Sequence, residues 1–265
     1  MVRRRKEWFN DEDFWERYAP IMFDDSRWAE VPLAADGVTR LAGLDLYPPE
    51  SPGPGAEFPP CPPRLLDLCC GFGRMTLEFT RRGFTCTGVD STESYLKTAA
   101  GDAAAENLDI ELVRADIRDF VRPACFDLAV NLYVSFGYFA DPQDDKQVLL
   151  NAYQSLKEGG TLIIETLGKE IAVRDFVKSE WFRRAGCYVL TEYTVIDSWA
   201  SLRNRWTLLK EGERIEKEFT QRLYAASELR ALLLEAGFSR VEIYGGWDES
   251  PYDERAEKLI AVGRK

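Results

Sequence analysis

The chain has 265 residues, of which 45% are apolar, so it can bury a substantial core in one or two domains. Its 34 basic and 45 acidic side chains give a net charge of -11, which disfavours nucleic acid as a partner because most of the surface would repel phosphate. The sequence has no histidine, which excludes a Ser/His/Asp triad, a Cys/His pair and histidine-containing zinc sites; no metal site is predicted.

The first part of the chain is aromatic and helical in pattern. Trp15 and Tyr18 belong to a stripe of large rings at helix-like spacing, and residues 48–63 that follow hold eight of the 13 prolines. We expect residues 1–47 to form a helical cap laid over a site and residues 48–63 to form a stiff linker. The remaining residues, 64–265, would be the main domain.

The main domain alternates between short apolar runs and helical segments. The expected strands cover 64–70, 84–90, 109–116, 126–134 and 159–168, and the expected helices cover 75–83, 91–107 and 143–156. Strands that are apolar throughout and alternate with helices indicate a mostly parallel sheet covered on both faces. The sequence therefore predicts a doubly wound α/β fold.

The alternation breaks at about residue 186. Three β-rich runs at 187–197, 201–210 and 213–225 predict an antiparallel meander inserted over about 186–224. A helix at 227–238 and strands at 239–246 and 258–265 then complete a seven-stranded, Rossmann-like sheet. We expect the meander to cover the site, and a homodimer through it is one option. No run reaches the roughly 18 apolar residues of a spanning helix, and the start lacks the pattern of a secretory signal. The chain is therefore expected to be cytoplasmic, without a membrane partner.

The first strand-to-helix turn, LLDLCCGFGR at residues 65–74, is the expected ligand cradle. Gly71 and Gly73 allow a close backbone approach, but Thr76 replaces the third glycine of a dinucleotide-binding turn. Asp67, inside the preceding strand, would repel a pyrophosphate and attract an ammonium group. The neighbouring cysteines are expected to pack rather than react.

Two further acids follow at the ends of successive strands. Asp90 stands where a carboxylate can bind both ribose hydroxyls, and Asp116 precedes the apolar Ile117. A ligand with an amine, a free ribose and an adenine-like ring, but no phosphate, matches this set. S-adenosylmethionine (SAM) has these features. A NAD-dependent oxidoreductase stays open as a competitor, although Asp67 and Thr76 disfavour it.

The motifs DLCCGFG, GVD, RADIRDF and FDLAVNLYVSFGYF, in this order, resemble those of class I SAM-dependent methyltransferases of the bacterial small-molecule type, over about residues 64–170. The resemblance implies SAM as cofactor and S-adenosylhomocysteine as product. It implies that Asp67 and the backbone of Cys70, Gly71, Phe72 and Gly73 hold the methionyl end. It further implies that Asp90 binds the ribose, Asp116 the adenine amino group, Ile117 the ring face and Asn131, through its backbone, the region near the methyl group. Tyr18 is expected to contact the cofactor from the cap.

The fourth strand gives limited information on the methyl acceptor. It ends in Asn131-Leu132-Tyr133-Val134 rather than an Asn/Asp-Pro-Pro-aromatic motif, which argues against adenine or glutamine amides as acceptors. Tyr133 and Tyr138 would form an aromatic wall, and Glu165 is the best candidate to orient or deprotonate the acceptor, although a solvated strand-end acid explains it equally well. We expect in-line transfer to nitrogen or oxygen of a small metabolite. The alternatives are a methyltransferase acting on a peptide or RNA and a non-catalytic SAM-binding regulator.

Overall fold

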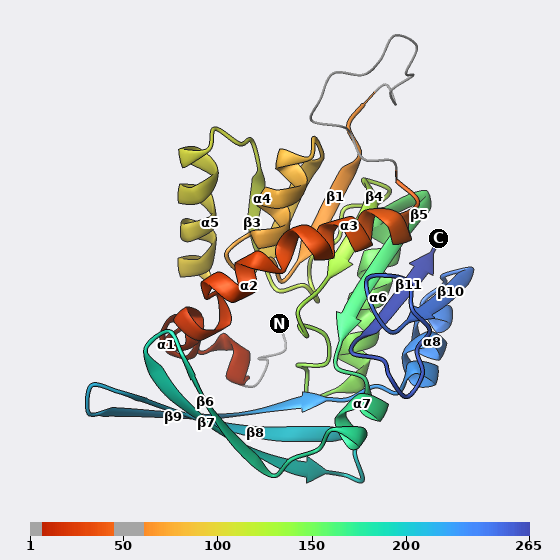
Figure 1. The fold of residues 1–265 in the computed structure, drawn as a ribbon. Coiled ribbons are helices and arrows are strands. Elements are labelled where there is room, and N and C mark those ends of the chain that lie inside the picture. The colour runs from red at the N-terminus through yellow and green to blue at the C-terminus, as the bar shows by residue number, and fades with distance from the viewer. Residues whose placement is uncertain (1–6, 45–60) are drawn as a thin grey trace.

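A seven-stranded sheet forms the centre of the molecule in the computed structural model, which describes residues 7–44 and 61–265 (Figure 1). Its order is β10-β11-β5-β4-β1-β2-β3, and only β11 runs antiparallel to its neighbours. The strands are β1 (Arg64–Leu68), β2 (Thr85–Asp90), β3 (Glu111–Arg114), β4 (Phe126–Asn131), β5 (Leu156–Thr166), β10 (Arg240–Tyr244) and β11 (Leu259–Arg264). This confirms the doubly wound α/β fold. Strand order reverses at β1 and β4, where such sheets bind ligands.

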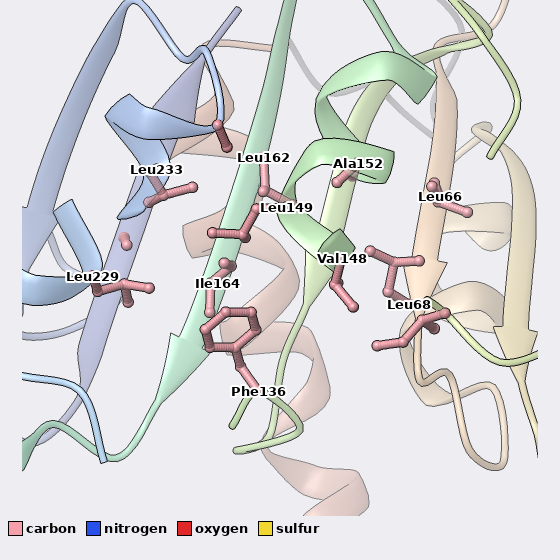
Figure 2. Packing of buried hydrophobic residues seen from close by; sticks show 14 of the residues in the cluster. Leu66, Leu68, Phe136, Val148, Leu149, Ala152, Leu162, Ile164, Leu229 and Leu233 are labelled. Atoms are coloured by element: carbon pink, nitrogen blue, oxygen red, sulfur yellow. The ribbon is translucent and has the colours of Figure 1, made fainter. Parts of the chain in front are cut away.

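Helices cover both faces of this sheet because successive strand residues point to opposite sides. Leu65 lies on the face covered by α3 (Val31–Ala42) and α4 (Arg74–Arg81), whereas Leu66 lies on the face covered by α6 (Pro142–Ser155) and α8 (Ala226–Glu235). Figure 2 shows the second face, with Leu149 and Leu233 against the strands. Helix α5 (Glu93–Ala105) lies beside α4, and a Cβ on Gly73 would come within 3.0 Å of Ala99.

Helix α3 is a layer of the main domain rather than part of a cap. Its apolar side packs on the sheet, and a Cβ on Gly37 would lie 2.7 Å from Trp247. Arg264 of β11 donates hydrogen bonds to the last carbonyls of α3, at Leu41 and Ala42. The prediction placed all of residues 1–47 in a cap. The aromatic stripe that suggested a cap ends before α3, and α3 itself packs on the main sheet. Most of the predicted linker, 48–63, lies outside the described residues.

A second sheet, of four antiparallel strands, is formed by the part of the chain between α7 (Lys169–Arg174) and α8. Its strands are β6 (Ser179–Arg184), β7 (Cys187–Ile196), β8 (Ser201–Lys210) and β9 (Glu213–Arg222), in sequential order. The predicted meander lacked β6 and therefore began too late. Strand β6, SEWFRR, is an edge strand in which four of six side chains are exposed and its two rings are adjacent, so it has no apolar alternation to detect.

Helix α1 (Glu12–Met22) packs on the small sheet, which Figure 1 shows beneath it. Phe14, Tyr18 and Ile21 are fully buried against β7 and β8. The Tyr18 hydroxyl donates a 2.7 Å hydrogen bond to the carbonyl of Trp206. Tyr18 therefore docks α1, which corrects the expectation that it contacts a cofactor. In the described part of the chain, no helix has both the length and the apolarity to cross a membrane.

Candidate active site

A cavity of about 500 Å³ opens at the carboxyl ends of the parallel strands. Rings of the N-terminal segment, including Trp15 and Phe23, and of the small sheet, including Trp206 and Phe219, form its opposite wall. Most of the predicted site residues line it: Asp67, Cys70, Gly71, Asp90, Asp116, Ile117, Tyr133, Tyr138 and Glu165. The tertiary structure thus brings residues from across the chain to one cavity.

Three residues of the turn after β1 have left-handed backbone conformations, with φ values of 61° at Cys69, 56° at Gly71 and 74° at Gly73. A Cβ on Gly71 would lie 2.9 Å from the ring of Phe23, so this glycine admits a ring of the N-terminal segment. Phe72 stacks on the same ring at 4.2 Å and lies outside the cavity wall, as Gly73 does. Burial raises the pKa of the Cys69 and Cys70 thiols, which makes both poor nucleophiles.

Asp67 is a buried acid that no basic side chain pairs with among the described residues. Its carboxylate accepts hydrogen bonds from the backbone N–H of Thr76 at 3.1 Å and from the Thr76 hydroxyl at 2.7 Å. Burial nevertheless raises the pKa of Asp67 to about 7. Thr76, which the sequence showed only as a missing glycine, is therefore the partner of this acid.

Asp90 links the end of β2 to the glycine turn. One carboxylate oxygen accepts a hydrogen bond from Gly71 N–H at 2.9 Å and the other from Thr92 N–H at 2.8 Å. Burial raises its pKa despite these bonds. The Thr92 side chain and the Ser91 backbone also hydrogen-bond this carboxylate, which lines the cavity.

Asp116 is ion-paired, which the sequence analysis missed. Arg118, buried between the rings of Phe9 and Phe139, bonds the Asp116 carboxylate at 2.6 Å. The same guanidinium pairs with Glu7 at 2.7 Å and with Asp144 at 2.8 Å. The signal was the arginine two residues after the acid in RADIRDF. Arg118 thus ties the N-terminal segment to the end of β3, beside the buried Ile117.

The end of β4 is strained. Tyr133 and Val134 have φ values of 56° and 64°, which non-glycine residues rarely adopt. Glu165 holds this conformation: its Oε2 accepts a 2.6 Å hydrogen bond from Tyr133 N–H, and its backbone carbonyl accepts one from Val134 N–H. Asn131 lies behind the wall, where its amide donates to the carbonyl of Leu68 at 3.0 Å.

Glu165 is occupied at both carboxylate oxygens, because its Oε1 accepts a hydrogen bond from Lys258 at 3.3 Å. This arrangement suits a group that orients its neighbours better than one that takes up a proton. Burial raises the pKa of the Tyr133 and Tyr138 phenols, so both hydroxyls stay protonated. The Tyr133 hydroxyl donates to the weak sulfur acceptor of Met75 at 3.6 Å. Tyr138 also packs edge-on against Trp8, with ring centroids 4.8 Å apart.

Comparison with known proteins gives a consistent result. A family model described as a methyltransferase domain matches residues 65–160. A candidate methyltransferase of Geobacillus sp. (strain WCH70) is 24% identical over 215 residues, or 76% of this chain and 84% of that protein. The CcbJ methyltransferase from Streptomyces caelestis has a TM-score of 0.77 at 17% identity, over 98% of this chain and 99% of the other.

A SAM-bound amino pentose methyltransferase from Micromonospora echinaspora is similar as well, with a TM-score of 0.68 at 19% identity. The alignment covers 94% of this chain and 96% of that one. At such identities the solved structures establish a shared fold. That fold extends over nearly the whole chain, so it includes the small sheet and the N-terminal helices.

Proposed function

We propose that this SAM-dependent methyltransferase of the class I fold transfers the methyl group to a nitrogen or oxygen of a small metabolite. The observation that carries the proposal is the opposite wall of the cavity, where rings such as Trp15 and Trp206 face the strand ends. A volume of about 500 Å³ lies within the range of small-molecule sites. A peptide or RNA acceptor would instead call for a broad open cleft. The amino pentose acceptor of the Micromonospora relative agrees with a small substrate.

The cavity suits SAM chemically. We infer that Asp67 faces the methionyl ammonium, because a cation would offset the burial of this acid. Asp90 would bind the ribose hydroxyls, Asp116 the adenine amino group and Ile117 the ring, at the ends of β2 and β3. When bound, SAM supplies a methyl group on a positively charged sulfur. Acidic strand ends would favour such a ligand over a dinucleotide phosphate.

The protein's own contribution to the reaction is alignment and exclusion of water. We infer that the hydroxyls of Tyr133 and Tyr138 donate to the acceptor and that Glu165 positions the strained wall that carries Tyr133. An amine acceptor would enter neutral, and the proton it loses after methylation would pass to water. No strong base is required for this step.

The direct test measures S-adenosylhomocysteine formation with small amines and hydroxy compounds, with peptides and with RNA. We expect turnover only with small molecules, and turnover confined to a peptide or RNA would overturn the proposal. SAM binding with no turnover on any substrate would instead indicate a regulator. Thermal shifts with SAM and with NAD test the cofactor independently of the acceptor.

The homodimer through the small sheet stays a prediction. The outward face of this sheet exposes Trp181, Tyr188, Leu190 and Leu209, which such a dimer would bury. We expect sedimentation to show a dimer that Trp181→Ser weakens. A monomer at all concentrations would contradict it.

A further inference from the structure

Arg74 is a buried cation in the cavity wall. It is the first residue of α4, its exposed fraction is 6%, and it lines the cavity. Its guanidinium carbon lies 4.0 Å from the ring centroid of Tyr133 and 4.9 Å from that of Phe23. These two rings hold the planar group in place.

The hydrogen-bonding capacity of Arg74 is largely unused. A guanidinium carries five N–H donors, and in Arg74 one nitrogen donates, to the carbonyl of Arg27 at 3.1 Å. The other cations of the cavity wall are neutralised: Arg27 pairs with Glu30 at 3.1 Å, Arg184 with Asp24 at 3.3 Å and Lys258 with Glu165 at 3.3 Å. Within the described ranges, Arg74 has no carboxylate at ion-pair distance.

The charges of Glu30 and Asp67 act on Arg74 from beyond ion-pair distance and favour its charged form. A buried guanidinium with no directly bonded carboxylate would still be stabilised by a ligand that supplies one. Burial lowers the pKa of Arg74, but an arginine stays charged at neutral pH. Its planar fork matches a carboxylate, which can accept two parallel hydrogen bonds from it. The cavity therefore has a preformed position for a planar anion.

We propose that the methyl acceptor carries a carboxylate and that Arg74 binds it, which makes Arg74 a specificity-determining residue and the acceptor a small amino or hydroxy acid. The inference rests on the proposed function, because it assumes that the cavity holds an acceptor. Arg74 lies between the two ends of the cavity, because it follows Gly73 and feels the charge of Asp67 on one side and stacks on Tyr133 on the other. The Tyr133 contact favours the acceptor end, since the N–H of Tyr133 is bound by Glu165. Asp90 and Asp116 lie at the ends of other strands, β2 and β3.

A second carboxylate source is the methionyl part of SAM itself, which has the same chemistry. The two sources are separated by comparing SAM with its decarboxylated analogue, which lacks that group. If the cofactor carboxylate is the partner, Arg74→Met weakens the binding of SAM and leaves the binding of the analogue unchanged. That result would overturn the acceptor assignment.

The acceptor arm uses the protein saturated with S-adenosylhomocysteine and titrated by calorimetry with benzoate and with benzamide, chosen because the wall is aromatic. We expect the native protein to bind benzoate more tightly than benzamide. Arg74→Met should lower the affinity for benzoate by about ten- to hundredfold and leave the affinity for SAM unchanged. Arg74→Lys should recover part of the loss. Arg81→Met is the matched control, since Arg81 lies on the same helix in surface pairs with Glu78 and Glu106.

Equal binding of benzoate and benzamide by the native protein, or unchanged benzoate binding by Arg74→Met, would overturn the inference. Urea unfolding of each variant establishes that it is folded. Binding of benzoate tests the role of Arg74, whereas turnover tests the proposed function, so failure of one can be told from failure of the other. A native enzyme that methylates neutral amines and does not prefer benzoate keeps the proposed function and loses the role of Arg74.

Discussion

The two walls of the cavity are built by different interactions. The strand-end wall, at β1, β2, β4 and β5, is polar and fixed by hydrogen bonds to the main chain, as at Asp90 and Glu165. The covering wall, formed by α1 and the small sheet, is fixed by packed rings such as Phe14 and Trp206. The strand-end wall carries the carboxylates of Asp67, Asp90 and Glu165, and the covering wall carries aromatic rings.

The difference predicts separable phenotypes. Changes in the covering wall should lower stability first, because packing energy holds α1 in place. Changes in the strand-end wall should alter ligand binding and its pH dependence while the fold persists. Arg118 is the exception, because it joins Asp116 of one wall to Glu7 of the other.

Phe14→Ala should have the largest effect. Phe14 is buried between α1 and the small sheet, and truncation of such a ring lowers the free energy of unfolding by about 3 to 5 kcal/mol. Urea unfolding measures the loss. Leu33→Ala, at a side chain that is 65% exposed on α3, is the control and should change little. Similar losses in the two variants would argue against a packed covering wall.

Asp90→Ala should weaken SAM binding by about a hundredfold while unfolding stays cooperative, since charge-assisted hydrogen bonds to the ribose and to Gly71 are lost. Calorimetry gives the affinity. Asp109→Ala is the control, because it removes an exposed acid from the same half of the domain, and it should bind SAM with the affinity of the native protein. Unchanged affinity in Asp90→Ala would sink the assignment of this acid to the cofactor.

Asp67 should make SAM affinity depend on pH. Its pKa is raised to about 7, and an ammonium ligand favours the ionised form, so affinity should be about tenfold lower at pH 6 than at pH 8. Binding near pH 6 should release a proton, which calorimetry in buffers of different ionisation enthalpy detects. Asp67→Asn should remove this dependence, and a native protein with flat affinity over this range would contradict it.

The same group predicts the pH dependence of stability in the free protein. Because the folded pKa is raised above the unfolded value, the folded state binds more protons between about pH 4 and 7. The contribution of Asp67 to the free energy of unfolding therefore falls as the pH rises through that window and levels off above it. The difference between the native protein and Asp67→Asn in urea unfolding isolates this contribution.

Glu165→Gln should have the smallest effect. If Glu165 orients Tyr133, the amide retains an oxygen for the Tyr133 N–H, and kcat should fall less than about tenfold with the pH profile unchanged. Loss of a general base would instead lower kcat by roughly 10² to 10⁴. Single-turnover kinetics on an accepted substrate separates the two roles.

The parallel sheet and its helices could be predicted because the evidence for each element lies within a few neighbouring residues. The apolar run 126–134 and the glycine turn at 71–73 identify a strand and a ligand-binding turn without distant contacts. Edge strand β6 could not be predicted, since its polar residues lack that pattern. Helix α3 was assigned to the wrong layer, because amphipathicity shows that a helix is buried but not against what.

The sequence by itself determined the order of the strands and helices and the acids at the strand ends, because hydrophobic period and turn chemistry are local properties. Only the tertiary structure decided the partners: Thr76 for Asp67, Glu7 for Arg118, Tyr133 N–H for Glu165, and the packing of Tyr18 on the small sheet. These pairings join segments distant in the chain or depend on which side chains share a cavity. Spacing along the sequence does not contain that information.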